Sequence, residues 1–551
     1  MKKDFLWLMG FALLLTTRVN GAAEKWAGWG DLQPGPNAVG FKLTRAYDQT
    51  RIFHSNAAFR GLSEQAETAR PIRIYMWYPA QAAEQESLRL RDYVRMAAED
   101  FGPIAEEKTS SDESLPLPVQ LAKGLTEEKQ RQLFTVRTAA FPNAAPLVQR
   151  FPLIVLGQGL YYESPLSLLT LAEYLASQGY VVATCPLLGT YSRLVNLTAA
   201  DLETEVRDME FVISQTRLLP FVDKDRMGLV GYDLGGMAGL LLAMRNPWIK
   251  AMATLDAGIL YPHFSGLPAN SPQYRETRFT IPWLMMTQDR FVTSWGDKER
   301  NLFDRKTVGD SYLLLFDTDN HGGFTSYAMF GIESEVPGFW GPIKGNSRRL
   351  METVCLSIGR FFDGYLKRDL RALESLRQDP RQAGLADVLV SVKSKTGKPA
   401  PLFQDDYLHD IISRGTAAAL PKLRSDLAAG ESAVHFEESV LNWLGLHFLY
   451  WWGREKEAVE VFQLITELFP NSAGAFDTLG EAFLTVGNKE QALASYRKSL
   501  QLNPNSANAK AMIKRLEEKN ESGNGQNDGR RGGRGSGISR FDTLFGHRFS
   551  W

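Results

Sequence analysis

The sequence predicts an α/β protein with a doubly wound parallel sheet, followed by a C-terminal all-α module. Two observations predict this architecture. Residues 151–370 alternate short apolar runs with amphipathic runs, the pattern of parallel strands that are connected by helices. Residues 436–519 repeat small and aromatic residues with a period of 34, which is typical of stacked helix pairs. A chain of 551 residues is also too long for one ordinary domain.

The N-terminus has the layout of a cleaved secretory signal. Lys2 and Lys3 precede a 13-residue apolar stretch (5–17), and small residues follow at 21–23. This stretch is short for a membrane span, which needs about 20 residues, and no later apolar run approaches about 18 residues. We expect a signal peptide at 1–21, a secreted or periplasmic protein and no membrane span in the mature chain. An uncleaved N-terminal anchor is the alternative.

Composition limits the partners of this chain. Apolar residues make up 44% and charged residues 23%, as in ordinary globular proteins. The net charge of −1 gives no overall basic surface, so we expect no nucleic-acid partner. Only two cysteines occur, Cys185 after a strand-like run and Cys355 in a helix-like run, and we expect buried free thiols. A disulfide is the alternative in an exported chain.

Four zones follow the signal. A domain at 24–370 combines a strand-rich N-terminal part and a lid with the α/β core at 151–370. A connecting segment at 371–435 contains several helix breakers, and the repeats follow at 436–519. The Gly-, Asn- and Arg-rich tail at 520–551 is expected to be disordered, although its last residues are aromatic.

Within the core, apolar runs alternate with helical patterns in chain order. Expected strands are 151–159, 180–187, 223–231, 249–256, 281–289 and 310–321; expected helices are 167–179, 201–218 and 234–245. In a sheet of this kind, ligand chemistry belongs at the carboxyl ends of the strands. Four side chains fall at such ends: Asp233, Asp256, Asp289 and His321.

The run GYDLGG (231–236) joins an expected strand to an expected helix. It has the form of a nucleophile elbow, a strained turn that lifts one side chain above the sheet. Gly231 and Gly235 remove side chains that would collide there, and the amide of Leu234 can serve an oxyanion hole. The helix N-terminus favours an ionised Asp233. An ordinary turn aspartate is the alternative interpretation.

The chain resembles a known family in several runs. PNAVGF, RPIRIYMWYPA, FPLIVLGQGLYYESPLSLLTLAEYLASQGYVVAT, DRMGLVGYDLGGMAGLLLA and ATLDAG look like the platelet-activating-factor acetylhydrolase group of α/β-hydrolases and its dienelactone-hydrolase-like relatives. Those enzymes cleave esters with a Ser-Asp-His triad. The resemblance implies that Asp256 is the triad acid, that His321 is the triad histidine, and that Leu160 and Leu234 give the oxyanion-hole amides.

Two positions depart from the family pattern. Asp233 stands in place of the nucleophilic serine, and Gln158 stands in place of a histidine at a strand end. Haloalkane dehalogenases and epoxide hydrolases use an aspartate nucleophile on the same fold, with a histidine base and a second acid. Asp233, His321 and Asp256 have the right types and chain order, with Asp289 as a rival acid. Tyr161 and Tyr162 are candidate hydrogen-bond donors to a leaving oxygen or packing aromatics.

Two functional hypotheses therefore stay open. In one, the protein is a secreted hydrolase that acts through Asp233 on an ester-like or other small organic substrate. In the other, the hydrolase fold is catalytically silent and the repeats bind a protein or peptide partner. We expect no cofactor and no metal, because the seven histidines are scattered and no phosphate loop or dinucleotide fingerprint occurs. His263 is interpreted as a loop residue.

The repeats resemble the tetratricopeptide family. Equivalent residues in the two copies are 34 positions apart: Gly453 and Gly487, Ala458 and Ala492, Phe462 and Tyr496, Pro470 and Pro504. Residues 508–519 are expected to form a capping helix. Two repeats rarely bury enough surface to be stable alone, so we expect them to pack against neighbouring helices or the α/β domain.

Overall fold

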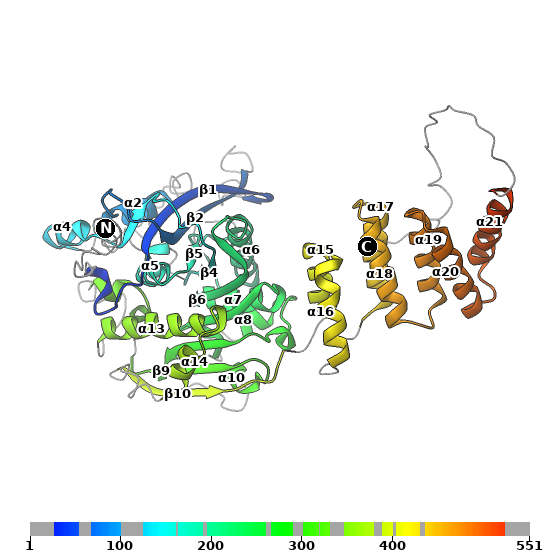
Figure 1. The fold of residues 1–551 in the computed structure, drawn as a ribbon. Helices are drawn as coiled ribbons and strands as arrows, with labels where there is room; N and C mark the ends of the chain where they lie inside the picture. Colours follow the sequence, from blue (N-terminus) through cyan, green and yellow to red (C-terminus); the bar gives the residue numbers. More distant parts are fainter. Residues whose placement is uncertain are drawn as a thin grey trace, which may run out of the picture. The chain divides into compact units, whose positions relative to one another are not determined.

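The computed structural model divides into two units, residues 1–400 and 401–551 (Figure 1). The described residues are 27–53, 68–100, 125–160, 164–190, 195–260, 266–289, 301–318, 320–330, 346–378, 388–400, 404–429 and 436–523. The expected signal peptide at 1–21 lies outside them.

The first unit is built on one mixed sheet. In the described residues its strands are β1 (Ala38–Phe53), β2 (Thr68–Ala80), β3 (Ala140–Pro142), β4 (Phe151–Gly157), β5 (Val181–Thr184), β6 (Val222–Tyr232), β7 (Ile249–Leu255), β8 (Trp283–Gln288), β9 (Ser311–Phe316) and β10 (Leu389–Lys395). Their order is β10-β9-β8-β7-β6-β4-β5-β2-β1-β3. The six neighbouring strands β9-β8-β7-β6-β4-β5 are parallel. At the two edges of this parallel block, β10 pairs antiparallel with β9 and β2 pairs antiparallel with β5.

The order of the central strands determines where a site can form. The chain passes from β4 to β5 on one side, and then crosses to β6 on the other side of β4. The carboxyl ends of β4 and β6 therefore flank a topological switch point, where open α/β sheets leave a crevice. Every residue of β4 is buried, as expected for a central strand that is covered on both faces.

Helices cover both faces of this sheet (Figure 1). One apolar cluster joins the sheet to α5 (Leu169–Ser177) and α13 (Ser347–Leu366). A second cluster joins the opposite face to α6 (Ala199–Thr216) and α7 (Leu234–Arg245). The sequence prediction of a doubly wound α/β fold is therefore confirmed.

Shorter elements complete the first unit. Within the described ranges, its other helices are η1 (Ala27–Trp29), α2 (Leu90–Glu99), α4 (Glu127–Thr135), η3 (Pro165–Leu168), η4 (Gly258–Leu260), α8 (Gly266–Ala269), η5 (Glu276–Arg278), α10 (Leu302–Arg305), η6 (His321–Phe324), α11 (Tyr327–Phe330) and α14 (Leu370–Arg377). Both cysteines are buried and free, as the sequence predicts. In the described part of the chain, no helix combines the length and the apolar character that crossing a membrane requires.

Two element boundaries differ from the sequence prediction. The strand expected to run to His321 ends at Phe316, because the amide of Thr318 bonds back to Phe316 and the hydroxyl of Thr318 accepts from Asn320. The helix expected from Asp201 begins at Ala199, because the hydroxyl of Thr198 caps it by accepting from the amide of Asp201.

The domain limits also differ. The first unit extends to Ala400 rather than 370, because β10 pairs with β9 and closes that edge of the sheet. The rest of the expected connecting segment, 371–435, supplies α15 (Gln404–Arg414) and α16 (Thr416–Ala429) to the second unit. The last helix reaches Gly523, past the expected start of the tail at 520; residues 524–551 lie outside the described residues.

The second unit is helical in its described residues. After α15 and α16 it contains α17 (Glu438–Tyr450), α18 (Glu455–Leu468), α19 (Ala473–Thr485), α20 (Lys489–Leu502) and α21 (Ala507–Gly523). A similar contact occurs in two helix pairs, with aromatic rings 34 positions apart and glycines 35 positions apart. Gly445 lies under the ring of Phe462, and Gly480 lies under the ring of Tyr496, so an added Cβ would come within 2.7 Å and 3.0 Å of these rings. Each helix pair thus closes on the same glycine–aromatic contact.

Candidate active site

The turn after β6 holds Asp233 in a strained backbone conformation. Its φ of 49° and ψ of −117° lie in a sparsely populated region for a residue with a side chain. Close backbone packing enforces the turn. A Cβ on Gly231 would lie 2.4 Å from the carbonyl oxygen of Gly235, and a Cβ on Gly235 would lie 2.2 Å from the backbone of Gly157. The elbow geometry predicted from GYDLGG is therefore present.

Asp233 presents its carboxylate at the switch point of the sheet. The Leu160 amide, just after β4, donates to Asp233 Oδ2 over 2.8 Å. His321 Nε2 lies 3.9 Å from the same oxygen. The Asp233 side chain keeps 23% of its surface exposed, so the carboxylate can be reached from solvent. Its neighbour Leu234 supplies the first amide of α7, a group that has no partner within a helix.

His321 lies between two carboxylates. Its Nδ1 atom is 2.6 Å from Asp256 Oδ2, on the side of the ring opposite the Asp233 contact. Tyr232 stacks on the imidazole with ring centroids 4.7 Å apart, and its hydroxyl donates to the carbonyl oxygen of His321. Burial lowers the pKa of His321, but the carboxylates of Asp233 and Asp256 outweigh it and raise that pKa to about 10. The imidazole is therefore protonated at neutral pH.

Asp256, at the end of β7, is held by several donors. Its Oδ1 accepts from the Thr287 hydroxyl at 2.7 Å and from the Gln288 amide at 3.3 Å, and its Oδ2 accepts from the side-chain amide of Gln288. The side chain is only 1% exposed. Of the two acids that the sequence suggested, the structure bonds His321 to Asp256; Asp289 follows β8.

Gln158 has a supporting position. It is fully buried, its Nε2 donates to the Thr184 hydroxyl, and its Oε1 accepts from the Ser167 hydroxyl. Its backbone carbonyl oxygen accepts from the amide of Gly235 at 2.8 Å. The side chain thus ties the end of β4 to its surroundings, while the backbone ties β4 to the elbow.

Sequence reasoning missed three residues of this site: Tyr232, Thr287 and Gln288. Tyr232 directly precedes Asp233, and Thr287 and Gln288 are the two residues before Asp289. Their positions at the carboxyl ends of β6 and β8, the edge where ligand chemistry belongs, were the available signal. Tyr161, Tyr162 and His263 lie outside the described residues.

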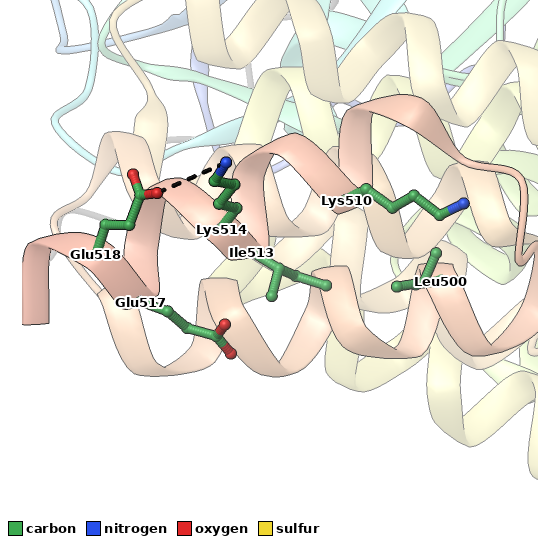
Figure 2. Close-up of a pocket in the computed structure, with 6 residues that line it drawn as sticks. All are labelled: Leu500, Lys510, Ile513, Lys514, Glu517 and Glu518. Carbon is green, nitrogen blue, oxygen red and sulfur yellow. Dashed lines mark ion pairs between the residues drawn. The ribbon is translucent and has the colours of Figure 1, made fainter.

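A pocket of about 320 Å³ occurs in the other unit, on α20 and α21 (Figure 2). Its lining is Leu500, Lys510, Ile513, Lys514, Glu517 and Glu518, with an ion pair between Lys514 and Glu518. This lining contains no histidine or nucleophile pair. Among the described residues, no group of three or more His, Cys, Asp or Glu side chains is placed to hold a metal ion.

Comparisons with known proteins add little to this geometry. No protein-family model matches the chain, and no curated protein matches its sequence. One solved structure that matches is the ferulic acid esterase from Streptomyces cinnamoneus, at 17% identity and a TM-score of 0.44. That match covers 66% of this chain and 98% of the esterase chain.

The sheet order and the elbow assign the first unit to the α/β-hydrolase fold. At its switch point an accessible carboxylate, an imidazolium and a buried carboxylate form a continuous row. Chemically, such a row offers a nucleophilic oxygen, one transferable proton and a fixed counter-charge.

Proposed function

We propose that the protein is a hydrolase whose Asp233 carboxylate attacks an electrophilic carbon of a small organic substrate. The observation that carries this proposal is the Leu160 amide, which donates to Asp233 Oδ2 at 2.8 Å. In a serine esterase the equivalent amide donates a hydrogen bond to the substrate oxygen on which negative charge develops. Here it holds the carboxylate itself, which supports chemistry in which Asp233 becomes the acyl group.

In the first step, Asp233 Oδ1 forms a bond to a saturated carbon and the bond from that carbon to its leaving atom breaks. An epoxide is a substrate of this kind, and its ring oxygen leaves with the electron pair. The protonated His321 then transfers its Nε2 proton to that oxygen. The products are an ester on Asp233, a neutral imidazole and a hydroxyl group on the bound substrate. A pKa of about 10 supports this role, because the proton is present at neutral pH.

In the second step, water attacks the Asp233 ester carbon. The neutral His321 accepts a proton from the water, with its ring oriented by the bond from Nδ1 to Asp256. The negative charge that develops on Oδ2 falls on the atom to which the Leu160 amide donates, and the Leu234 amide is the second donor. Collapse breaks the bond from the ester carbon to the substrate oxygen, and the second hydrogen of the attacking water passes to that oxygen. The diol leaves, the Asp233 carboxylate is restored, and His321 keeps the proton that it accepted from the water.

Three further features belong to this proposal. The sequence runs that resemble the platelet-activating-factor acetylhydrolase and dienelactone-hydrolase-like group support kinship with it, with aspartate in the nucleophile position. The recurring glycine–aromatic contacts at Gly445–Phe462 and Gly480–Tyr496 support tetratricopeptide repeats that bind a protein or peptide. The signal layout at 1–21 supports a secreted or periplasmic location.

The test is turnover of three probes that differ in the group attacked: styrene oxide, 1-bromobutane and 4-nitrophenyl acetate. We expect hydrolysis of the epoxide, loss of that activity in Asp233→Asn, and little ester cleavage by the wild type. An epoxide activity that survives Asp233→Asn would contradict the proposal.

A second candidate function is a silent hydrolase fold that acts as a binding protein. The favouring observation is again the contact between Leu160 and Asp233, because it occupies an oxyanion donor that ester cleavage requires. The variant Asp233→Ser separates the two candidates. If the wild type cleaves none of the probes and Asp233→Ser cleaves 4-nitrophenyl acetate, the silent fold is the better account.

A further inference from the structure

The helical unit exposes a cluster of aromatic side chains on one side of α17. Trp443 is 53% exposed, Tyr450 46%, Trp451 60% and Trp452 42%. The ring of His447 lies between two of them, 3.8 Å from the Trp443 ring centroid and 4.8 Å from that of Trp451. We call Trp443, His447, Tyr450, Trp451 and Trp452 the α17 aromatic patch. Large exposed apolar patches in soluble proteins mark interaction sites.

The opposite side of α17 explains why this patch is not part of the core of the unit. Leu441, Leu444 and Phe448 are buried against the neighbouring helices. Trp443, His447 and Trp451 recur every fourth residue on the other side, where polar residues are the norm for a helix that has one packed face. Two exposed tryptophans at such positions, with Trp452 exposed beside them, need a partner of matching chemistry.

Residues 539–551 carry the aromatic and cationic side chains that such a patch would bind. Residues 539–551, SRFDTLFGHRFSW, carry Phe541, Phe545 and Phe549 at four-residue spacing. Arg540 and Arg548 stand among these phenylalanines, and a guanidinium binds favourably over the face of a tryptophan ring. Neither the α/β fold nor the repeats account for this aromatic segment. We propose that residues 539–551 dock on the α17 aromatic patch of their own chain.

The net charges of the tail and of the helical unit also favour residues 539–551 as the segment that docks on the α17 aromatic patch. Residues 524–551 contain five arginines, two aspartates and no lysine or glutamate, a net charge of +3. Residues 404–523 contain 17 acidic and 12 basic side chains, a net charge of −5. Opposite net charges favour association of the segment with this unit.

The chain is long enough for this contact. Fifteen residues, 524–538, separate the end of α21 from the aromatic segment. Extended, they span at most about 50 Å. From α21 to α17 there are three packing steps, through α20 and α19, each of about 10 Å. A short tether also gives an effective concentration of about 1 mM, so a Kd near 100 µM for the free segment would suffice for about 90% occupancy.

The experiment uses a chain that ends at Ile538 and a labelled synthetic peptide of residues 539–551. We expect the peptide to bind the shortened chain with a Kd of about 100 µM or tighter, and the full chain at least tenfold more weakly, because the tail occupies the patch. The double variant Trp443→Ala/Trp451→Ala in the shortened chain should weaken binding at least tenfold. Ile513→Ala, in the pocket of Figure 2, and the exposed Val486→Ala are matched controls that should not.

Four outcomes would overturn the proposal. The peptide could fail to bind the shortened chain, or bind the double tryptophan variant as well as its parent. Loss of binding in Ile513→Ala alone would move the site to the α20–α21 pocket. Self-association of the full chain, lost on removal of 539–551 as measured by light scattering, would place the segment on a second copy instead. Because both tryptophans are exposed, the double variant should keep its fold, which circular dichroism checks.

Discussion

Asp233 and Asp256 follow neighbouring parallel strands, and both have a positive φ, 49° and 42°. Their surroundings differ. Asp256 is buried and accepts from Thr287, Gln288 and His321, whereas Asp233 is partly exposed and accepts from one backbone amide. A carboxylate that is saturated with donors is a poor nucleophile and a good orienting group. The comparison shows how one residue type at one edge of a sheet acquires two roles from its neighbours.

Asp233→Asn should have the largest effect on activity. The substitution keeps the shape but removes the nucleophilic charge, so we expect a loss of roughly 10⁴-fold or more in turnover of the epoxide probe. The free energy of unfolding should change little, because the side chain is partly exposed. Turnover above about a tenth of the wild-type rate would remove Asp233 from the mechanism.

Asp256→Asn should differ from Asp233→Asn in that it lowers the stability of the fold strongly. An amide at this position leaves the imidazolium without its buried counter-charge and sets an N–H group against the donors of Thr287 and Gln288. We expect a loss of about 3 kcal/mol in the free energy of unfolding, measured with urea, and a slower second step. Equal destabilisation by Asp233→Asn and Asp256→Asn would erase the distinction between the two carboxylates.

Thr287→Val tests one donor to Asp256. Losing a hydrogen bond to a buried charge should cost about 2 kcal/mol in the free energy of unfolding. Thr353→Val is the matched control, since the Thr353 hydroxyl is also buried but donates to a neutral helix carbonyl; its cost should be about 1 kcal/mol. Equal costs would mean that the Thr287 bond is not charge-assisted.

A further comparison concerns pH. The folded pKa of His321, about 10, lies above its unfolded value near 6.5, so its protonation stabilises the fold fully below about pH 6.5. That contribution is lost as the pH rises towards 10. The difference in unfolding free energy between the wild type and His321→Gln should therefore shrink from pH 6 to pH 10. A constant difference would show that the two carboxylates do not hold the proton.

Much of the first unit follows from local pattern. The alternation of apolar runs and helices predicts the parallel block, and the chain order of Asp233, Asp256 and His321 predicts that they meet, because parallel strands end at one edge. Strand ends are harder to predict. The turn after Phe316 depends on a hydroxyl of Thr318, which has no signal in hydrophobic periodicity.

The supporting residues required the fold itself. Gln158 looked like a departure from a family pattern, yet its amide bridges Thr184 and Ser167, which lie 26 and 9 residues away. The tie between Gln288 and Asp256 likewise joins residues 32 positions apart. Pairings of this kind depend on strand order, which the sequence alone does not specify. The boundary of the first unit at Ala400 has the same cause, since β10 joins the sheet by pairing with β9.

The central claim is that Asp233 carries a covalent intermediate, and intact-protein mass spectrometry of His321→Gln tests it most directly. His321 donates a proton to a leaving epoxide oxygen, so the probe for this variant is 1-bromobutane, whose bromide leaves without a proton. Without His321 as base, breakdown of the ester should then slow more than its formation. After incubation with 1-bromobutane, the account predicts a mass increase of one butyl group, mapped by peptide analysis to Asp233. The matched double variant Asp233→Asn/His321→Gln should show none. An adduct that persists in the double variant, or that maps to another residue, would contradict the account.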